Sequence, residues 1–194
     1  MEESDYVLIS RSENAVSSLE LASVFLTLTK SDYRYWKWYV IALHSGLQGL
    51  FSLALHNGNT HLVQKPNVMQ QMISAEQLGS PYPLPRMDNF LKLYKKLQIK
   101  NNLRHEHSMP FDSNDIFDKA IEWVDSCRDD FLHFNVGSWQ IEVKSIIENS
   151  ILCCEIADFI VSKSHSIIWQ EEDYEQRAKS SLLALQKALL FAER

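Results

Sequence analysis

Cysteine, glycine and proline are all scarce in this chain of 194 residues, and each shortage excludes a class of structure. Cys127, Cys153 and Cys154 are too few and too irregularly spaced for a disulfide framework or a zinc site. We therefore expect three reduced thiols, buried or half-buried in the protein. Five glycines and five prolines suit long helices better than a β fold with many turns.

Residues 38–55 form a mostly apolar stretch of 18 residues without a formal charge. Its length meets the criterion for a membrane-spanning helix. His44, Ser45 and Gln48 interrupt the stretch, however, so a helix buried in a bundle is favoured over a membrane span.

The chain starts with an acidic segment, in which Met1 is followed by Glu2, Glu3 and Asp5. A secretion signal needs a basic start and an apolar core, and this segment has neither. We therefore expect a cytoplasmic protein that does not associate with a membrane.

The chain is acidic: it has 19 lysines and arginines and 25 aspartates and glutamates, which gives a formal net charge of −6. Such an acidic protein is a poor nonspecific binder of nucleic acid, so any RNA site must be local. The most basic segment, residues 92–104, contains no acid and fits either a track for an RNA backbone or a solvated helix face. Its basic residues are Lys92, Lys95, Lys96, Lys100 and Arg104.

Apolar residues recur at spacings of three and four over much of the chain, which is the pattern of amphipathic helices. Within one such segment, Gly46 and Gly49 would let a second backbone approach closely. The prediction is an all-α, antiparallel up-down bundle of about five to six helices, in one domain spanning residues 1–194. The expected helices cover residues 12–29, 35–56, 88–98, 113–132, 139–162 and 171–192, with a short additional helix left open around residues 68–77.

Helix ends are expected at residues whose side chains accept hydrogen bonds from free amides. Ser12 or Asn14 would cap the first helix, and Asp112 or Ser113 would cap the helix that ends near residue 132. Trp139 is the expected start of the helix that follows.

The predicted helix over residues 113–132 contains an arginine in an unusual place. Arg128 lies at the edge of the apolar arc that includes Ile121 and Val124. A guanidinium there must extend to solvent, pair with an acid or bind a ligand. The opposite side is acidic and expected to be solvated, with Asp118, Glu122, Asp125 and Asp129.

A histidine follows this arginine near the end of the same helix. His133 stands five positions after Arg128, and Asn135 and Gly137 then break the helix, so both side chains are expected to face one groove. An arginine holds phosphate oxygens with a bidentate fork, and a histidine transfers a proton near neutral pH. The pair supplies the minimum chemistry for cutting RNA without a metal, although an arginine paired with a buried acid is an ordinary structural alternative.

These residues resemble the motif of the HEPN superfamily, which is named for its occurrence in higher eukaryotes and prokaryotes. That motif is an arginine, then asparagine, aspartate or histidine, three variable residues and a histidine, and Arg128, Asp129 and His133 match it in order. The strings at residues 131–134 and 139–142 look like a bacterial subgroup of the family. The resemblance covers about residues 30–165, with the motif as its sharpest part.

Membership of this family would imply a helical bundle that forms a homodimer across the motif helices. Many members resemble metal-independent endoribonucleases of toxin–antitoxin and phage-defence systems, while others bind a nucleotide, RNA or a protein partner without catalysis. The resemblance thus implies catalytic roles for Arg128 and His133, with a less definite role for Asp129. It also implies RNA as substrate and an antitoxin or a nucleotidyltransferase-like protein as partner, with no cofactor.

Other histidines have simpler interpretations. His44 lies beside the two glycines on an apolar helix and is expected to be a core histidine with satisfied hydrogen bonds. His105 and His107 form a pair that lacks a defined third ligand, so surface histidines are favoured and no metal site is expected.

Overall fold

The computed structural model describes residues 6–7, 9–56, 58–133 and 138–192. Within these ranges the chain is helical, with an isolated bridge between Gln64 and Met87 and no strand. The α-helices are α1 (Arg11–Leu28), α2 (Tyr35–Ala54), α3 (Pro66–Leu78), α4 (Phe90–Leu97), α5 (Asp115–Leu132), α6 (Val143–Ser162) and α7 (Glu172–Ala192). Two short 3-10 helices, η1 (His61–Val63) and η2 (Lys100–Asn102), lie in the connections.

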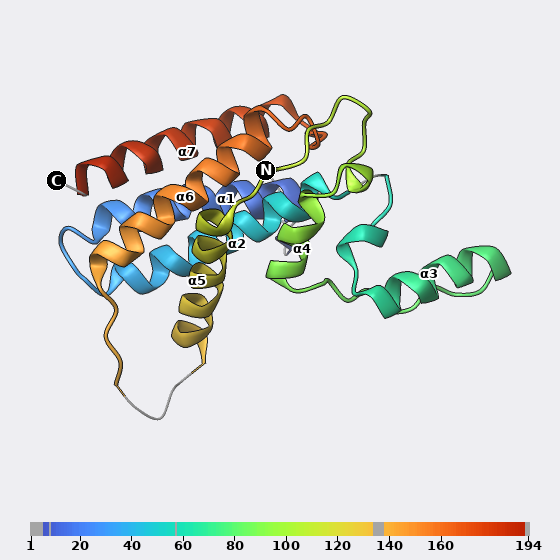
Figure 1. Ribbon diagram of the computed structural model, residues 1–194, viewed down its shortest axis with the longest axis horizontal. Coiled ribbons are helices and arrows are strands. Elements are labelled where there is room, and N and C mark those ends of the chain that lie inside the picture. Colours follow the sequence, from blue (N-terminus) through green and yellow to red (C-terminus); the bar gives the residue numbers. More distant parts are fainter. Residues whose placement is uncertain (1–5, 8, 57, 134–137, 193–194) are drawn as a thin grey trace.

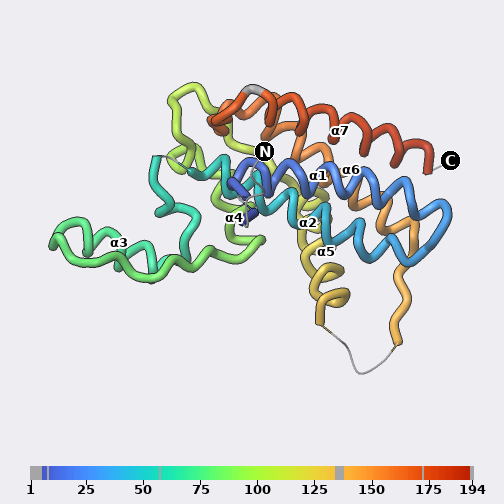
Figure 2. The backbone as a smooth tube through the Cα atoms, turned by 180° about the vertical axis from the view of Figure 1, so that it is seen from behind, coloured from blue at the N-terminus to red at the C-terminus, as the bar shows by residue number. Residues whose placement is uncertain are grey.

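The long helices α1, α2, α6 and α7 run side by side and form the body of the molecule (Figures 1 and 2). Helix α5 packs on α2 and α6 and extends away from this body, while α3 stands apart from it (Figures 1 and 2). The predicted all-α bundle is confirmed. Its α-helices number seven in the described ranges, because the short helix left open near residue 70 extends over 13 residues.

Helix α2 is the centre of the hydrophobic core and packs against α1, α4, α5 and α6. Its aromatic and aliphatic side chains, including Tyr39, Leu43, Leu47 and Phe51, are fully buried. Burial of such side chains is the main favourable contribution to folding. The uncharged stretch is therefore a core helix, and among the described residues no helix has the length and apolar character to cross a membrane.

Helices α1 and α2 pack very closely because two glycines of α2 face α1. A Cβ atom added at Gly49 would lie 2.6 Å from the Cβ and 2.8 Å from the Cα of Ala15. A Cβ atom added at Gly46 would lie 2.6 Å from the Cδ2 of Leu19. The predicted close approach of a second backbone is confirmed, and that backbone belongs to α1.

The expected helix starts differ from the observed ones by a few residues. Ser10 caps α1 and accepts a hydrogen bond from the Glu13 amide at 3.0 Å. Asn114 caps α5 and accepts hydrogen bonds from the amides of Ile116 and Phe117. In both cases the capping residue is the one with extended backbone angles, which the spacing of apolar residues does not reveal.

Helix α6 begins at Val143, four residues after the expected start at Trp139. The Trp139 ring instead packs on the Phe131 ring of α5, with 4.9 Å between the ring centroids. This contact holds the chain against the end of α5 before α6 starts. The predicted helix breakers Asn135 and Gly137 lie outside the described residues.

The three cysteines are free and buried, as the sequence predicts. Burial raises the pKa of the Cys127 thiol to about 12, and that of Cys154 to about 12 as well. These thiols are therefore protonated at neutral pH, where they pack as small apolar side chains.

Candidate functional site

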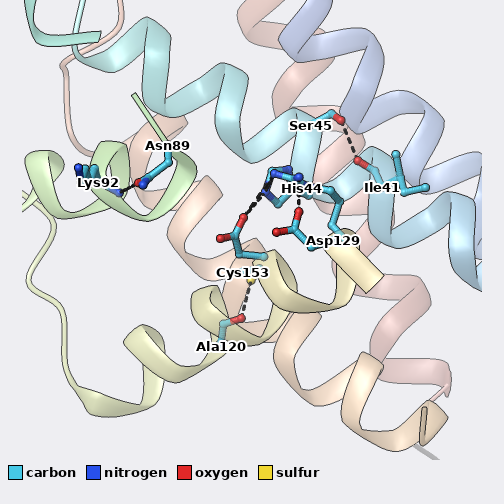
Figure 3. Close-up of polar contacts among 10 residues, drawn as sticks. Ile41, His44, Ser45, Asn89, Lys92, Ala120, Asp129 and Cys153 are labelled. Carbon is cyan, nitrogen blue, oxygen red and sulfur yellow. Dashed lines mark hydrogen bonds and ion pairs between the residues drawn. The ribbon is translucent and has the colours of Figure 1, made fainter. Parts of the chain in front are cut away.

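A polar cluster joins α2 and α5 at the position of the predicted motif. The Nε2 atom of His44 lies 2.9 Å from the Oδ1 atom of Asp125 and 3.0 Å from the Nη2 atom of Arg128. Figure 3 shows His44 of α2 facing α5, with Asp129 beside it. The two helices therefore meet through hydrogen bonds as well as through apolar packing.

His44 is a buried neutral histidine. Its side chain is 2% exposed and stacks on the Phe90 ring, with 4.0 Å between the ring centroids. The pKa of His44 is lowered to about 4, mainly by burial; the hydrogen bond to Asp125 opposes this shift and the positive charge of Arg128 adds to it. The contact between His44 and Asp125 is therefore a hydrogen bond at neutral pH and not an ion pair.

A neutral imidazole restricts what the Nε2 atom can do. If Nε2 is protonated it donates to Asp125, and if it is not it accepts from Arg128, but it does not do both. Asp125 has fewer other hydrogen-bond partners than Arg128. Apart from His44, its Oδ1 atom has only Arg128, at the long distance of 3.4 Å, whereas Arg128 also donates to Asp129. This difference favours the tautomer in which His44 donates to Asp125.

Arg128 is held within the chain without being enclosed. Its Nη1 atom donates to Asp129, its Nη2 atom lies 3.4 Å from Asp125, and 22% of its side chain is exposed. Asp125 is 21% exposed and Asp129 is 51% exposed. The guanidinium therefore has acidic partners, as the structural alternative requires, but it also keeps contact with solvent.

His133 lies at the C-terminal end of α5, where its backbone amide donates to the Asp129 carbonyl at 2.8 Å. Its side chain is exposed. In the described part of the chain, no hydrogen bond joins the His133 ring to Arg128. The structure thus brings Arg128 and Asp129 together and places His133 near them on the same helix, without a direct contact.

The acidic side of α5 is less solvated than the sequence predicts. Asp125 bonds His44, and Asp118 bonds both Ser113 and Lys95. The expectation of fully solvated carboxylates was wrong for these two residues, because α2 and α4 pack closely enough on α5 to supply polar partners.

The basic segment has intrachain partners for its lysines. Lys96 donates to the Asp88 carboxylate at 2.8 Å and to the carbonyl oxygens of Leu62 and Gln64. Lys95 pairs with Asp118, Lys92 lies 3.9 Å from Asp88, and Lys100 donates to the carbonyls of Glu106 and Ser108. These contacts fix α4 and η2 to the neighbouring segments of the chain. A role for the lysines in RNA binding stays a prediction.

Three histidines lie together on the loops at one end of the molecule. The rings of His105 and His107 are stacked with 5.2 Å between centroids, and the His165 ring lies 6.2 Å from that of His107. In the described ranges, no three histidine, cysteine or acidic side chains are arranged to hold a metal ion.

Sequence reasoning missed the parts played by His44 and Asp125 in this cluster. One signal was present, because a buried histidine on an apolar helix and an arginine on an apolar arc both need polar partners. Asp125 meets both requirements, because its Oδ1 atom lies 2.9 Å from the Nε2 atom of His44 and 3.4 Å from the Nη2 atom of Arg128.

Comparisons with protein-family models, with curated proteins and with solved structures give no match for this chain. Any functional assignment must therefore come from the residues and their geometry.

Proposed function

We propose that this chain is a HEPN-like, metal-independent endoribonuclease that acts as a homodimer in the cytoplasm, in a bacterial toxin or phage-defence system. The observation that supports this proposal best is the state of Arg128. Its guanidinium is held by Asp129 and Asp125, lies against His44 and remains 22% exposed, on the helix that ends at the exposed His133. A fixed and accessible guanidinium near an accessible imidazole suits phosphodiester cleavage.

In the proposed reaction the 2′-hydroxyl oxygen of RNA attacks the adjacent phosphorus, and the bond from phosphorus to the 5′ oxygen breaks. One His133 takes the proton of the 2′-hydroxyl, and the leaving 5′ oxygen takes a proton from the second His133 of the dimer. Arg128 stabilises the charge that develops on the phosphoryl oxygens. The products are a cyclic phosphate and a free 5′-hydroxyl.

Asp129 takes part through Arg128. Its carboxylate is half-exposed, so a bound phosphate can displace it from the guanidinium at modest cost. His44 and Asp125 are positioning residues in this proposal, because they touch Arg128 from the side that faces the core.

The proposed dimer is supported by exposed apolar side chains at the free end of α5 and in the segment that follows. Leu132 is 46% exposed, Trp139 is 39% exposed and Val143 is 44% exposed. Helix α5 also extends away from the body of the molecule there (Figure 1). A second copy of the chain would cover these side chains and bring two motifs together.

A second candidate function is a noncatalytic module on the same bundle that binds RNA, a nucleotide or a protein partner such as an antitoxin or a nucleotidyltransferase-like protein. Asp125 and Asp129 next to Arg128, together with the net charge of −6, favour it, because negative charge weakens phosphate binding.

The test is cleavage of single-stranded RNA by the purified protein in EDTA. The wild type should produce fragments with cyclic phosphate ends, and Arg128→Ala and His133→Ala should each reduce the rate by a factor of about 100 or more. Arg34→Ala and His107→Ala are matched controls at remote exposed positions and should cleave like the wild type. Circular dichroism establishes that each variant is folded.

Equal cleavage by the wild type and both motif variants would defeat the catalytic assignment. RNA or partner binding by the wild type without any turnover would favour the noncatalytic function instead.

A further inference from the structure

Three cavities meet at Arg11, the first residue of α1. Their volumes are about 560, 130 and 420 Å³, and Arg11 lines all three. The cavities lie along the first turns of α1 and the second half of α2. None of His44, Asp125, Arg128 and Asp129 lines these cavities, so they are separate from the cluster around Arg128.

The smallest of these cavities is positively charged. Arg11, Arg104 and His56 line it together with Ser12 and uncharged neighbours, and none of the described residues that line it is acidic. Helix α1 begins here, so the positive end of its dipole adds to the same corner. Both arginines are exposed, so water screens the repulsion between their guanidinium groups, and an anion bound between them would lower it further.

The two arginines also lack the carboxylate partners that three other arginines of this chain have. Arg34, Arg128 and Arg177 each pair with a carboxylate. Among the hydrogen bonds and ion pairs of the described residues, none involves the guanidinium of Arg11, Arg86 or Arg104. Of these three arginines, Arg11 and Arg104 line the same small cavity. In a protein with excess acid, such free guanidiniums are available to bind an anionic ligand bidentately.

The positive charges of Arg11 and Arg104 both act on His56. Its pKa is lowered first by burial, then by the positive charges of Arg11 and Arg104. An anion bound at this place would offset both charges and raise the pKa of the imidazole.

The largest cavity has a different character. Arg11 is the only charged side chain among the described residues that line it, and the other polar groups are amides and hydroxyls. Ser18 and Ser45 donate their hydroxyl hydrogens to carbonyls of their own helices, which leaves their lone pairs to accept from a ligand. A volume of about 560 Å³ is in the usual range for small-molecule sites. The polar lining consists of Asn14, Ser18, Ser45, Gln48, Ser52, Thr60 and Gln64.

We propose that this protein binds a small phosphorylated polyol, with its phosphate between Arg11, Arg104 and His56 and its hydroxyl groups in the larger cavity next to Arg11. Arginine forks match phosphate oxygens, and amides and serine hydroxyls match the hydroxyl groups of a sugar. The site shares Arg104 with the basic segment that could track RNA, but it contains none of Arg128, Asp129 and His133. Loss of RNA cleavage and loss of binding at this site can therefore be measured separately.

The test is isothermal titration of the full chain with ribose 5-phosphate, inorganic phosphate and ribose. Ribose 5-phosphate should bind, inorganic phosphate should bind more weakly and ribose should not bind. The double variant Arg11→Gln/Arg104→Gln should weaken binding of ribose 5-phosphate at least about tenfold, since it removes both charge-assisted contacts to the phosphate. Arg34→Gln, which removes one arginine at the other end of α2, should bind like the wild type.

NMR titration of His56 gives a second readout that does not depend on the variants folding. Its imidazole pKa should rise when ribose 5-phosphate is added and should not change with ribose. If the double variant fails to fold, Arg104→Gln alone, at an exposed loop position, replaces it. The proposal is overturned if no phosphate compound binds at about 10 mM, or if wild type and folded variant bind equally. Binding that persists in Arg128→Ala separates this site from the nuclease.

Discussion

The Nη2 atom of Arg128 lies 3.0 Å from the Nε2 atom of His44, although 84 residues separate them in the sequence. The same Nε2 atom lies 2.9 Å from Asp125. A neutral buried imidazole therefore contacts the residue on which the proposed chemistry depends. The imidazole is buried and stacked on Phe90, so it contacts Arg128 from the core, while 22% of the Arg128 side chain remains exposed.

The first prediction concerns stability at acid pH. The pKa of His44 is about 4 in the folded protein, and the ordinary pKa of a histidine, which applies to the unfolded chain, is 6.5. Between pH 4 and 6.5, therefore, His44 binds a proton in the unfolded chain but not in the folded protein. The stability that His44 contributes is therefore fully present above about pH 6.5 and is lost as the pH falls toward about 4, by up to roughly 3 kcal/mol. Urea unfolding at several pH values measures this loss.

His44→Gln provides the comparison, because glutamine keeps a polar group but does not titrate. The difference in unfolding free energy between wild type and His44→Gln should shrink as the pH is lowered. A difference that is constant from neutral pH to about pH 4 would mean that His44 does not have a depressed pKa.

The second prediction concerns the proton on His44. If Nε2 donates to Asp125, a double-mutant cycle with His44→Gln and Asp125→Asn should give a coupling of about 1–2 kcal/mol. The corresponding cycle with Arg128→Gln should give a smaller coupling, because Arg128 also bonds Asp129. Unfolding free energies of the single and double variants supply both values, and the reverse order would assign the proton to Nδ1.

Much of the fold follows from the order of residues along the chain, because helix formation depends on neighbours three and four positions away. The apolar spacing in α2 and α5 predicts both helices within a few residues. The cluster between them does not follow in this way. The pairing of His44 with Asp125 depends on how α2 crosses α5, and no local pattern contains that crossing.

The position of His133 illustrates the same limit. Its place at the end of α5 is predicted by the spacing of apolar residues, and the structure has it there. Whether it meets Arg128 depends on the conformation after the helix and on a second chain, and neither is determined by helical periodicity. Lys96 is similar, because its bond to Asp88 depends on a turn that leads into α4.

The third prediction concerns the close contact of α1 and α2. Gly49→Ala should lower the free energy of unfolding by about 1–3 kcal/mol, although alanine favours a helix by about 1 kcal/mol. The reason is that the new Cβ atom would lie 2.8 Å from the Cα of Ala15, which belongs to the backbone and cannot move alone. Chemical unfolding measures the change.

Gly46→Ala is the matched control for this substitution. Its nearest obstacle is the Leu19 side chain, which can rotate, so the loss of stability should be smaller than at Gly49. A loss at Gly46 equal to or greater than that at Gly49 would contradict the assignment of the backbone contact as the stronger constraint.

The fourth prediction concerns Arg177 of α7, which lies between two glutamates of α1. Its guanidinium bonds both carboxylate oxygens of Glu13, at 2.9 and 3.1 Å, and both of Glu20, at 2.8 and 2.9 Å. Arg177→Met should cost about 1–2 kcal/mol, because the groups are partly exposed and each contact is screened. Arg177→Lys should be more stable than Arg177→Met but less stable than the wild type, since a lysine does not form two bidentate pairs.

This cluster also predicts a second acid-sensitive contribution at lower pH than that of His44. The hydrogen bond from Arg177 holds the pKa of Glu13 below its ordinary value of 4.5. A carboxylate with a depressed pKa contributes stability above its unfolded value, and that contribution is lost as the pH falls below about 4.5. Arg177→Met should therefore unfold with a weaker pH dependence than wild type in this range, while His44→Gln should keep it. Thermal unfolding of the three proteins at about pH 3 to 5 distinguishes the two contributions, and parallel curves for wild type and Arg177→Met would refute the role of Glu13.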